Sequence, residues 1–181
     1  MDLTGIVELL QNSALSEWLR TSLKAMPIVE AVHVMAVATV FGTILLVDLR
    51  LLGYPSTKSS FSRLHRELLN WTWSSFGVAV VTGVLLFIVN AITYYNNTAF
   101  KVKMLLILLA GINMLVFERV TAKSVAGWDK DVMPPTAARL AGALSILLWV
   151  AVIVFGRWIG FTKGYDFSIP DDVQLDFSFP E

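Results

Sequence analysis

Four long apolar stretches divide the chain, and the segments between them carry most of its charged residues. Each stretch is close to the roughly 20 residues that an α-helix needs to cross about 30 Å of hydrocarbon. We therefore predict an all-α protein built around a four-transmembrane-helix bundle, residues 26–161. Its spans are expected to cover about residues 27–49, 68–93, 99–121 and 137–161.

Residues 1–25 show a different pattern, in which apolar and charged positions are interleaved. The apolar side chains fall on one helical face and are Leu15, Trp18, Leu19 and Leu23. This pattern is typical of an amphipathic helix that lies in the membrane interface. The segment lacks the basic start and the small-residue cleavage site of a signal peptide, so the first span is expected to remain as an anchor.

Residues 162–181 form an acidic tail with an alternating pattern. Its apolar residues occur at every second position: Val173, Leu175, Phe177 and Phe179. A period of two is typical of an extended strand, and a helical bundle offers no strand with which it could pair. The tail is therefore either disordered or added to the sheet edge of another chain. In the second case, residues 165–181 would contact a protein partner or another copy of the chain.

Composition supports a membrane protein and excludes several functions. Of the 181 residues, 56% are hydrophobic and 15% are charged, and the mean hydropathy is +0.67, so the lipid bilayer is the main partner. The 14 basic residues are balanced by 14 acidic ones, which leaves no excess positive charge for nucleic acid. The absence of cysteine excludes disulfides, cysteine-ligated iron–sulfur clusters and thiol catalysis. No phosphate-binding loop or nucleophile elbow is present, so the sequence leans against an enzyme.

The basic residues in the loops set the expected orientation. Because the number of spans is even, both termini lie on one side of the membrane. Eight Lys and Arg residues fall in the first and third loops, and six fall on the opposite side. Basic residues favour the cytoplasmic side, so both termini are expected outside the cytoplasm.

Glu30 and His33 are the first candidate site residues, because an ionisable group within a span is costly and is often functional. They are three positions apart and so share one helical face, where the carboxylate could fix the tautomer of the imidazole. Met104 of the third span is expected at the same depth, which predicts a polar pocket near the outer end. The alternative is a structural pair that positions helices, with Arg157 as the charge partner of Glu30.

A cofactor at His33 is the main chemical alternative. His33 and His65 are expected on opposite sides of the membrane, about 20 Å apart, so one haem iron cannot bind both. Haem b at His33 would need another ligand, such as Met104, and copper would suit the same imidazole and thioether. The sequence leaves open whether haem b, copper or no cofactor binds.

Other polar residues have structural interpretations. Asn113 lies near the middle of the third span, where an amide usually makes an interhelical hydrogen bond. Asp48 and Arg50 come where the first span leaves the membrane, so ordinary interfacial salt bridging or snorkelling accounts for them.

Several short motifs carry a resemblance to known membrane proteins. They are His33 with Gly42, Val47-Asp48-Leu49-Arg50-Leu51-Leu52-Gly53, Trp71-Thr72-Trp73, Thr82-Gly83-Val84-Leu85-Leu86-Phe87, Phe100 with Lys103, Asn113, Arg139-Leu140-Ala141-Gly142-Ala143-Leu144-Ser145 and Gly156-Arg157. Over roughly residues 18–161 the chain resembles a bacterial family of short four-helix inner-membrane proteins of unknown activity. It is also distantly similar to the membrane part of copper-resistance protein D and to b561-type cytochromes. The resemblance implies a bacterial inner-membrane protein with a link to haem or copper, and the orientation above makes both termini periplasmic.

Together these features favour an integral inner-membrane accessory or anchor subunit. Its outer pocket would lie around Glu30 and His33, and its C-terminal tail would dock a partner. The alternative is a membrane redox or copper-handling protein that binds haem b or copper at His33. The second alternative is a small transporter that uses Glu30 and Arg157, although no span is interrupted and no inverted repeat is evident.

Overall fold

The computed structural model of the protein describes residues 3–54, 61–117, 119 and 134–162. This part of the chain contains seven helices: α1 (Leu3–Gln11), α2 (Ala14–Thr21), α3 (Ala25–Leu51), α4 (Phe61–Val89), α5 (Ala91–Asn96), α6 (Thr98–Val116) and α7 (Thr136–Thr162). Among the described residues, four helices, α3, α4, α6 and α7, are long and apolar enough to cross a membrane. The all-α class with four spans is therefore confirmed, and the chain is a membrane-spanning helical protein.

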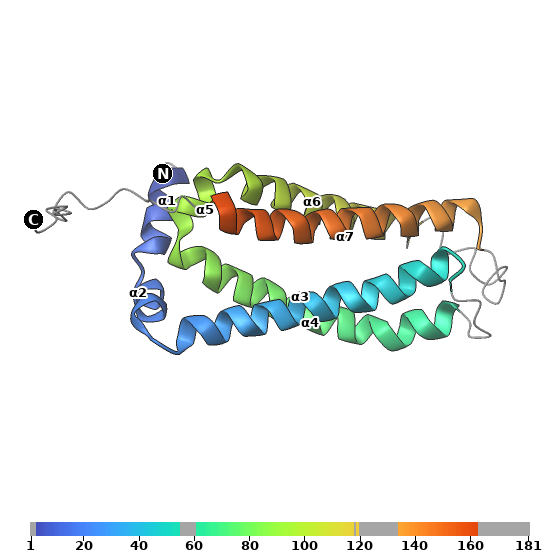
Figure 1. Cartoon of the computed structure of the whole chain (residues 1–181), viewed down its shortest axis with the longest axis horizontal. Coiled ribbons are helices and arrows are strands. Elements are labelled where there is room, and N and C mark those ends of the chain that lie inside the picture. Colours follow the sequence, from blue (N-terminus) through green and yellow to red (C-terminus); the bar gives the residue numbers. More distant parts are fainter. Residues whose placement is uncertain (1–2, 55–60, 118, 120–133, 163–181) are drawn as a thin grey trace, which may run out of the picture.

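The four long helices are arranged as two antiparallel hairpins (Figure 1). α3 packs along α4, α6 packs along α7, and α3 also packs against α7, which joins the two hairpins. We call the end at which α3 and α6 begin the terminal end, and the end at which they finish the loop end. α1, α2 and α5 lie at the terminal end, where α7 also finishes (Figure 1).

Local hydrogen bonds explain where several helices begin and end. The Asn97 side chain accepts a hydrogen bond from the Phe100 N–H at 3.0 Å and caps the start of α6. At the end of α3, Gly53 has a φ of 91°, a left-handed conformation that glycine adopts at low cost. This conformation lets the Tyr54 N–H reach the carbonyl of Leu49 at 2.8 Å and close the last turn. α3 therefore ends where its apolar stretch ends.

The second span ends earlier than the sequence predicts, because the helix breaks at Asn90. This residue has a φ of −134° and a ψ of 45°, and its N–H bonds to the Phe87 carbonyl at 3.2 Å rather than to one four residues back. The chain then continues as α5 instead of extending a single helix to residue 93.

The segment 1–25 contains two helices, α1 and α2, instead of one. Its placement in the membrane interface stays a prediction.

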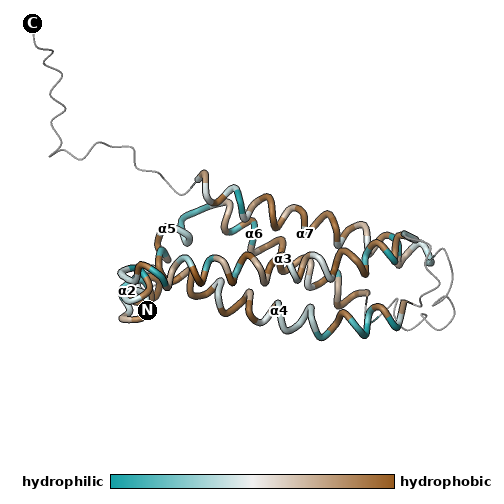
Figure 2. Tube along the Cα trace, turned by 60° about the horizontal axis from the view of Figure 1, so that its bottom comes forward, coloured by the Kyte–Doolittle hydropathy of each residue, from teal (hydrophilic) through white to brown (hydrophobic). Residues whose placement is uncertain are grey.

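Buried apolar side chains gather at the two ends of the bundle. The loop-end cluster consists of Leu51, Phe61, Phe117 and Ala138, and the terminal-end cluster of Leu19, Ile88 and Val89. Elsewhere on the long helices many large apolar side chains are exposed, as surfaces that face lipid require. Hydrophobic residues occupy much of the length of these helices (Figure 2). The predicted acidic tail beyond Thr162 lies outside the described residues.

Candidate functional site

His33 lies on α3 and faces α4, where it meets Thr82. The imidazole Nδ1 lies 2.9 Å from the Thr82 hydroxyl oxygen. The Thr82 hydroxyl oxygen also lies 2.7 Å from the Val78 carbonyl oxygen and 3.3 Å from the Ala79 carbonyl oxygen, both of which can only accept. A hydroxyl has one hydrogen. If that hydrogen goes to a carbonyl, Nδ1 carries the imidazole proton and donates it to Thr82, and Nε2 keeps its lone pair.

The His33 ring rests on a glycine of the same neighbouring helix. A Cβ atom at Gly83 would lie 3.2 Å from Cε1 and 3.7 Å from Nδ1 of His33. Small residues in transmembrane helices allow such a close approach. His33 is half-buried, and it is held between its hydrogen bond to Thr82 and the backbone of α4.

Lys103 brings a positive charge to the same region from α6. Its side chain lies along α7 at Gly156, where a Cβ atom would be 3.7 Å from Nζ. Lys103 is half-buried. It follows Asn97 by six residues, which places it about 9 Å along α6 from the helix start. We call His33, Thr82 and Lys103 the His33 layer.

The other residues predicted for the outer pocket lie on exposed surfaces. Glu30 is exposed one turn before His33, and its carboxylate makes no hydrogen bond or ion pair within the described part of the chain. Arg157 is exposed as well, and no ion pair joins it to Glu30 among the residues that the structure describes. Met104 is 42% exposed. The structure thus brings His33 to the Thr82 hydroxyl of α4, and does not bring it to Glu30.

The second histidine lies at the opposite end of the bundle. His65 is near the start of α4, at the loop end, and its ring stacks on Phe61 with 5.5 Å between the ring centroids. His33 is near the start of α3, at the terminal end. A haem held by both histidines therefore does not fit this fold.

Asp48 and Arg50 are buried at the loop end, although the sequence suggests ordinary interfacial positions for both. Their exposed fractions are 6% and 3%. The Ser145 hydroxyl of α7 hydrogen-bonds the Asp48 carboxylate, whose Oδ2 atom has no partner in the described part of the chain. α7 approaches so closely that a Cβ atom at Gly142 would lie 3.1 Å from the Asp48 carbonyl oxygen. The close packing of α7 helps to bury Asp48 and Arg50, which would be exposed to water at the end of an unpacked helix.

Two further hydrogen bonds each join the two helices of one hairpin. Asn113 of α6 donates from Nδ2 to the Ala141 carbonyl of α7 at 3.0 Å, which is the kind of bond expected for this amide. Thr72 of α4 donates to the Thr43 hydroxyl of α3 at 2.8 Å. Both bonds satisfy polar groups inside an apolar bundle, so their role is structural.

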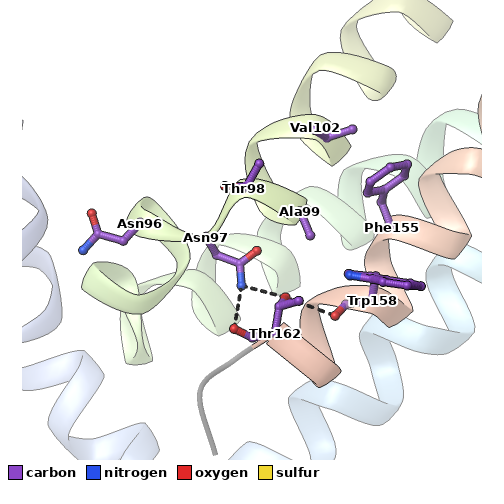
Figure 3. A pocket seen from close by; sticks show the side chains of 8 residues that line it. All are labelled: Asn96, Asn97, Thr98, Ala99, Val102, Phe155, Trp158 and Thr162. Carbon is purple, nitrogen blue, oxygen red and sulfur yellow. Dashed lines mark hydrogen bonds between the residues drawn. The ribbon is translucent and has the colours of Figure 1, made fainter.

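A pocket of about 400 Å³ opens between the start of α6 and the end of α7 (Figure 3). Its walls combine polar and apolar side chains: Asn96, Asn97, Thr98, Ala99, Val102, Phe155, Trp158 and Thr162. Asn97 donates to the Thr162 hydroxyl at 2.9 Å and so ties the two helices together beside the pocket. The walls of this pocket include none of the site residues that the sequence predicts.

Metal binding has limited support from the side chains present. Within the described residues, no group of three or more His, Asp or Glu side chains could hold a metal ion. With the Nδ1–H tautomer, the His33 layer supplies one unprotonated nitrogen, Nε2 of His33. A ligand set of His33 with Met104 stays a prediction.

Fold and site together define a membrane-spanning four-helix protein with a polar layer between its helices. Residues 23–162 match the family of unknown function DUF6644, and the chain belongs to this family. No match was found among curated proteins or among solved structures. The distant similarity to copper-resistance protein D and b561-type cytochromes therefore has no support from these comparisons.

Proposed function

We propose that the protein is an integral inner-membrane accessory or anchor subunit, with a polar pocket around His33 and a terminal end that binds a partner on the periplasmic side. The observation that supports this role is a helical cap, formed by α1, α2 and α5, at the end of the bundle where α7 also finishes (Figure 1). The chain that follows Thr162 starts at this end. A partner bound there could contact the cap and residues 165–181 together.

Specific contacts fix the cap to the bundle. The Ser16 hydroxyl donates to the Ile88 carbonyl at 3.2 Å, and the Gln11 side chain accepts from the Ile92 N–H at 3.0 Å. Leu19, which is 1% exposed, packs into the terminal-end cluster. A surface that is already ordered loses little conformational entropy on binding, which favours its use as a docking platform.

Several large apolar side chains are exposed at and next to the cap. The exposed fractions are 49% for Leu15 and 59% for Trp18 of α2, and 94% for Leu23, which follows α2 in the chain. Such side chains suit the membrane interface, where Trp is enriched. Contact with the interface would hold the cap level with the membrane surface, within reach of a membrane-bound partner.

Photo-crosslinking from the tail tests this proposal. A photoreactive amino acid is placed at Phe177 or at Ser178, neighbours that an extended strand would point to opposite sides. We expect one defined crosslinked product from Phe177 in native membranes, identified by mass spectrometry, and a much weaker one from Ser178. Equal and diffuse crosslinking from both positions, together with a monomeric purified protein, would contradict the accessory role.

A membrane redox or copper-handling protein is the second candidate, because the unprotonated Nε2 of His33 is a donor atom that suits iron or copper. The second donor proposed from the sequence, Met104, is 42% exposed. An absorption spectrum and elemental analysis of the detergent-purified protein provide the test. A Soret band or bound copper that disappears in a His33→Gln variant supports this function, and the absence of both contradicts it.

A further inference from the structure

The pocket between α6 and α7 changes from polar to apolar along its length (Figure 3). Asn97 and Thr162 lie at the terminal end, where α6 begins and α7 finishes. Val102 is about 6 Å along α6 from its start, and Phe155 is about 10 Å along α7 from its end. The pocket therefore runs from the ends of two membrane-spanning helices towards the hydrocarbon.

The walls leave hydrogen-bonding groups free for a ligand. Nε1–H of Trp158 has no acceptor among the described residues, and the indole nitrogen lies on the side of the ring towards Asn97 and Thr162 (Figure 3). An indole N–H can only donate. The exposed Thr98 hydroxyl also lacks a partner in the described part of the chain. A ligand that accepts hydrogen bonds is therefore favoured.

The charged residues of the helices that form the walls are all basic. Within their described bounds, α5, α6 and α7 contain no Asp or Glu. The basic residues next to the walls in the chain are Lys101, Lys103 and Arg157. Lys103 reaches from α6 to α7, where its Nζ lies 3.7 Å from the position of a Cβ atom at Gly156. An anionic ligand is therefore favoured over a zwitterion, because a ligand ammonium would meet no carboxylate on these helices.

We propose that this pocket binds one anionic phospholipid, with the phosphate and ester groups at its polar end and the first carbons of one acyl chain at its apolar end. Phosphate and ester oxygens accept hydrogen bonds, as the free donors on the walls require. The volume of about 400 Å³ lies in the range of about 300–1,000 Å³ typical of small-molecule sites. The rest of the chain continues along α6, where Leu105 is 54% exposed one turn beyond Val102.

This site goes beyond the proposed function, because it contains neither His33 nor a residue of the tail. A lipid bound here contacts both α6 and α7, so it should raise the thermal stability of the protein by mass action. Failure of lipid binding would leave the accessory role standing, and failure of the tail crosslinks would leave the lipid site standing.

Native mass spectrometry of the full chain in detergent provides the test. The probe is an equal mixture of phosphatidylglycerol and phosphatidylethanolamine with the same acyl chains. We expect one phosphatidylglycerol to be retained in preference by about threefold or more, since the difference is one exposed charge interaction. Glycerol 3-phosphate, which has the phosphate but no acyl chains, should not displace it. Equal retention of the two lipids would contradict the proposal, and displacement by glycerol 3-phosphate would make the pocket a site for free phosphate esters.

Matched variants locate the lipid on the protein. Val102→Phe adds bulk to a wall and should remove the preference for phosphatidylglycerol, whereas Val150→Phe, at a 44% exposed position of α7 outside the pocket, should keep it. Trp158→Phe keeps a ring but removes the N–H, so retention should fall about tenfold. Trp71→Phe, at a 66% exposed position of α4, should leave retention unchanged.

Two results with these variants would overturn the proposal. Equal loss of lipid in a pocket variant and its control would mean that the lipid binds elsewhere on the protein. A dimer that dissociates in Val102→Phe while lipid retention stays the same would mean that a second copy of the chain occupies the pocket. Should Val102→Phe fail to fold, the Trp158→Phe and Trp71→Phe pair still decides.

Discussion

Gly142 lies where α7 comes very close to α3. A Cβ atom there would be 3.0 Å from Cβ of Leu51 and 3.1 Å from the Asp48 carbonyl oxygen, so even alanine requires the helices to shift. We expect Gly142→Ala to lower the free energy of unfolding by about 1–3 kcal/mol. Unfolding from detergent micelles by increasing amounts of SDS measures the change.

Gly160→Ala is the control for this substitution on the same helix, because nothing lies within 4 Å of its Cβ position. The change should be neutral or stabilising, since glycine within a helix costs about 0.5–1 kcal/mol relative to alanine. Equal destabilisation by the two substitutions would contradict the close contact at Gly142.

Thr82 sets the tautomer of His33. Thr82→Val keeps the branched shape and removes the acceptor of the Nδ1–H, so we expect a loss of about 0.5–1.5 kcal/mol in the free energy of unfolding. The ¹⁵N spectrum of His33 should change to a mixture of tautomers. Thr39→Val is the control, because Thr39 is exposed and donates to the Met35 carbonyl of its own helix at 2.9 Å. An unchanged His33 spectrum in Thr82→Val would show that Thr82 does not set the tautomer.

At the level of helices, apolar run length predicts the four spans, because long runs leave few alternatives. It does not predict which faces meet. The spacing of Glu30 and His33 pairs them on one helix, whereas in the structure His33 turns to Thr82 of the next helix. Spacing within a helix follows from its 3.6-residue period, but rotation against the neighbours depends on how all four helices pack.

The α3–α4 hairpin keeps one register over much of its length. His33 pairs with Thr82 and Thr43 pairs with Thr72, and the partners on each helix are ten residues apart, about 15 Å. The sequence contains this equal spacing of polar residues. It could not be used as a prediction, because apolar boundaries place a span only to within about a turn.

Asn97 holds the start of α6 in two ways. Its side chain accepts from the Phe100 N–H at 3.0 Å and donates to the Thr162 hydroxyl at 2.9 Å. Asn97→Ala removes both bonds and should lower the free energy of unfolding by about 1–2 kcal/mol. Asn97→Asp keeps the cap and should lose less. Asn96→Ala, at an exposed neighbouring position, is the control in thermal unfolding. Equal stability of the two alanine variants would mean that the hydrogen bonds of the Asn97 side chain do not stabilise the protein.

For the whole molecule, the excess of basic residues predicts that the loop end lies in the cytoplasm. The chain has no cysteine, so one introduced cysteine can report each end. Asn96→Cys at the terminal end and Thr136→Cys at the loop end both replace exposed residues. We expect a membrane-impermeant maleimide to label Asn96→Cys in intact cells, and Thr136→Cys only after permeabilisation. The reverse pattern would move the proposed docking surface to the cytoplasm.

The two hairpins meet mainly through α3 and α7, with close contacts at Gly142 near the loop end. A contact near one end can act as a pivot. Gly156 is about 21 Å from Gly142 along α7, so a rotation of about 5° there displaces Gly156 by about 2 Å. Since His33 and Lys103 belong to different hairpins, such a rotation widens or narrows the gap between them. Bilayer thickness, which changes helix tilt, would then tune this gap mechanically.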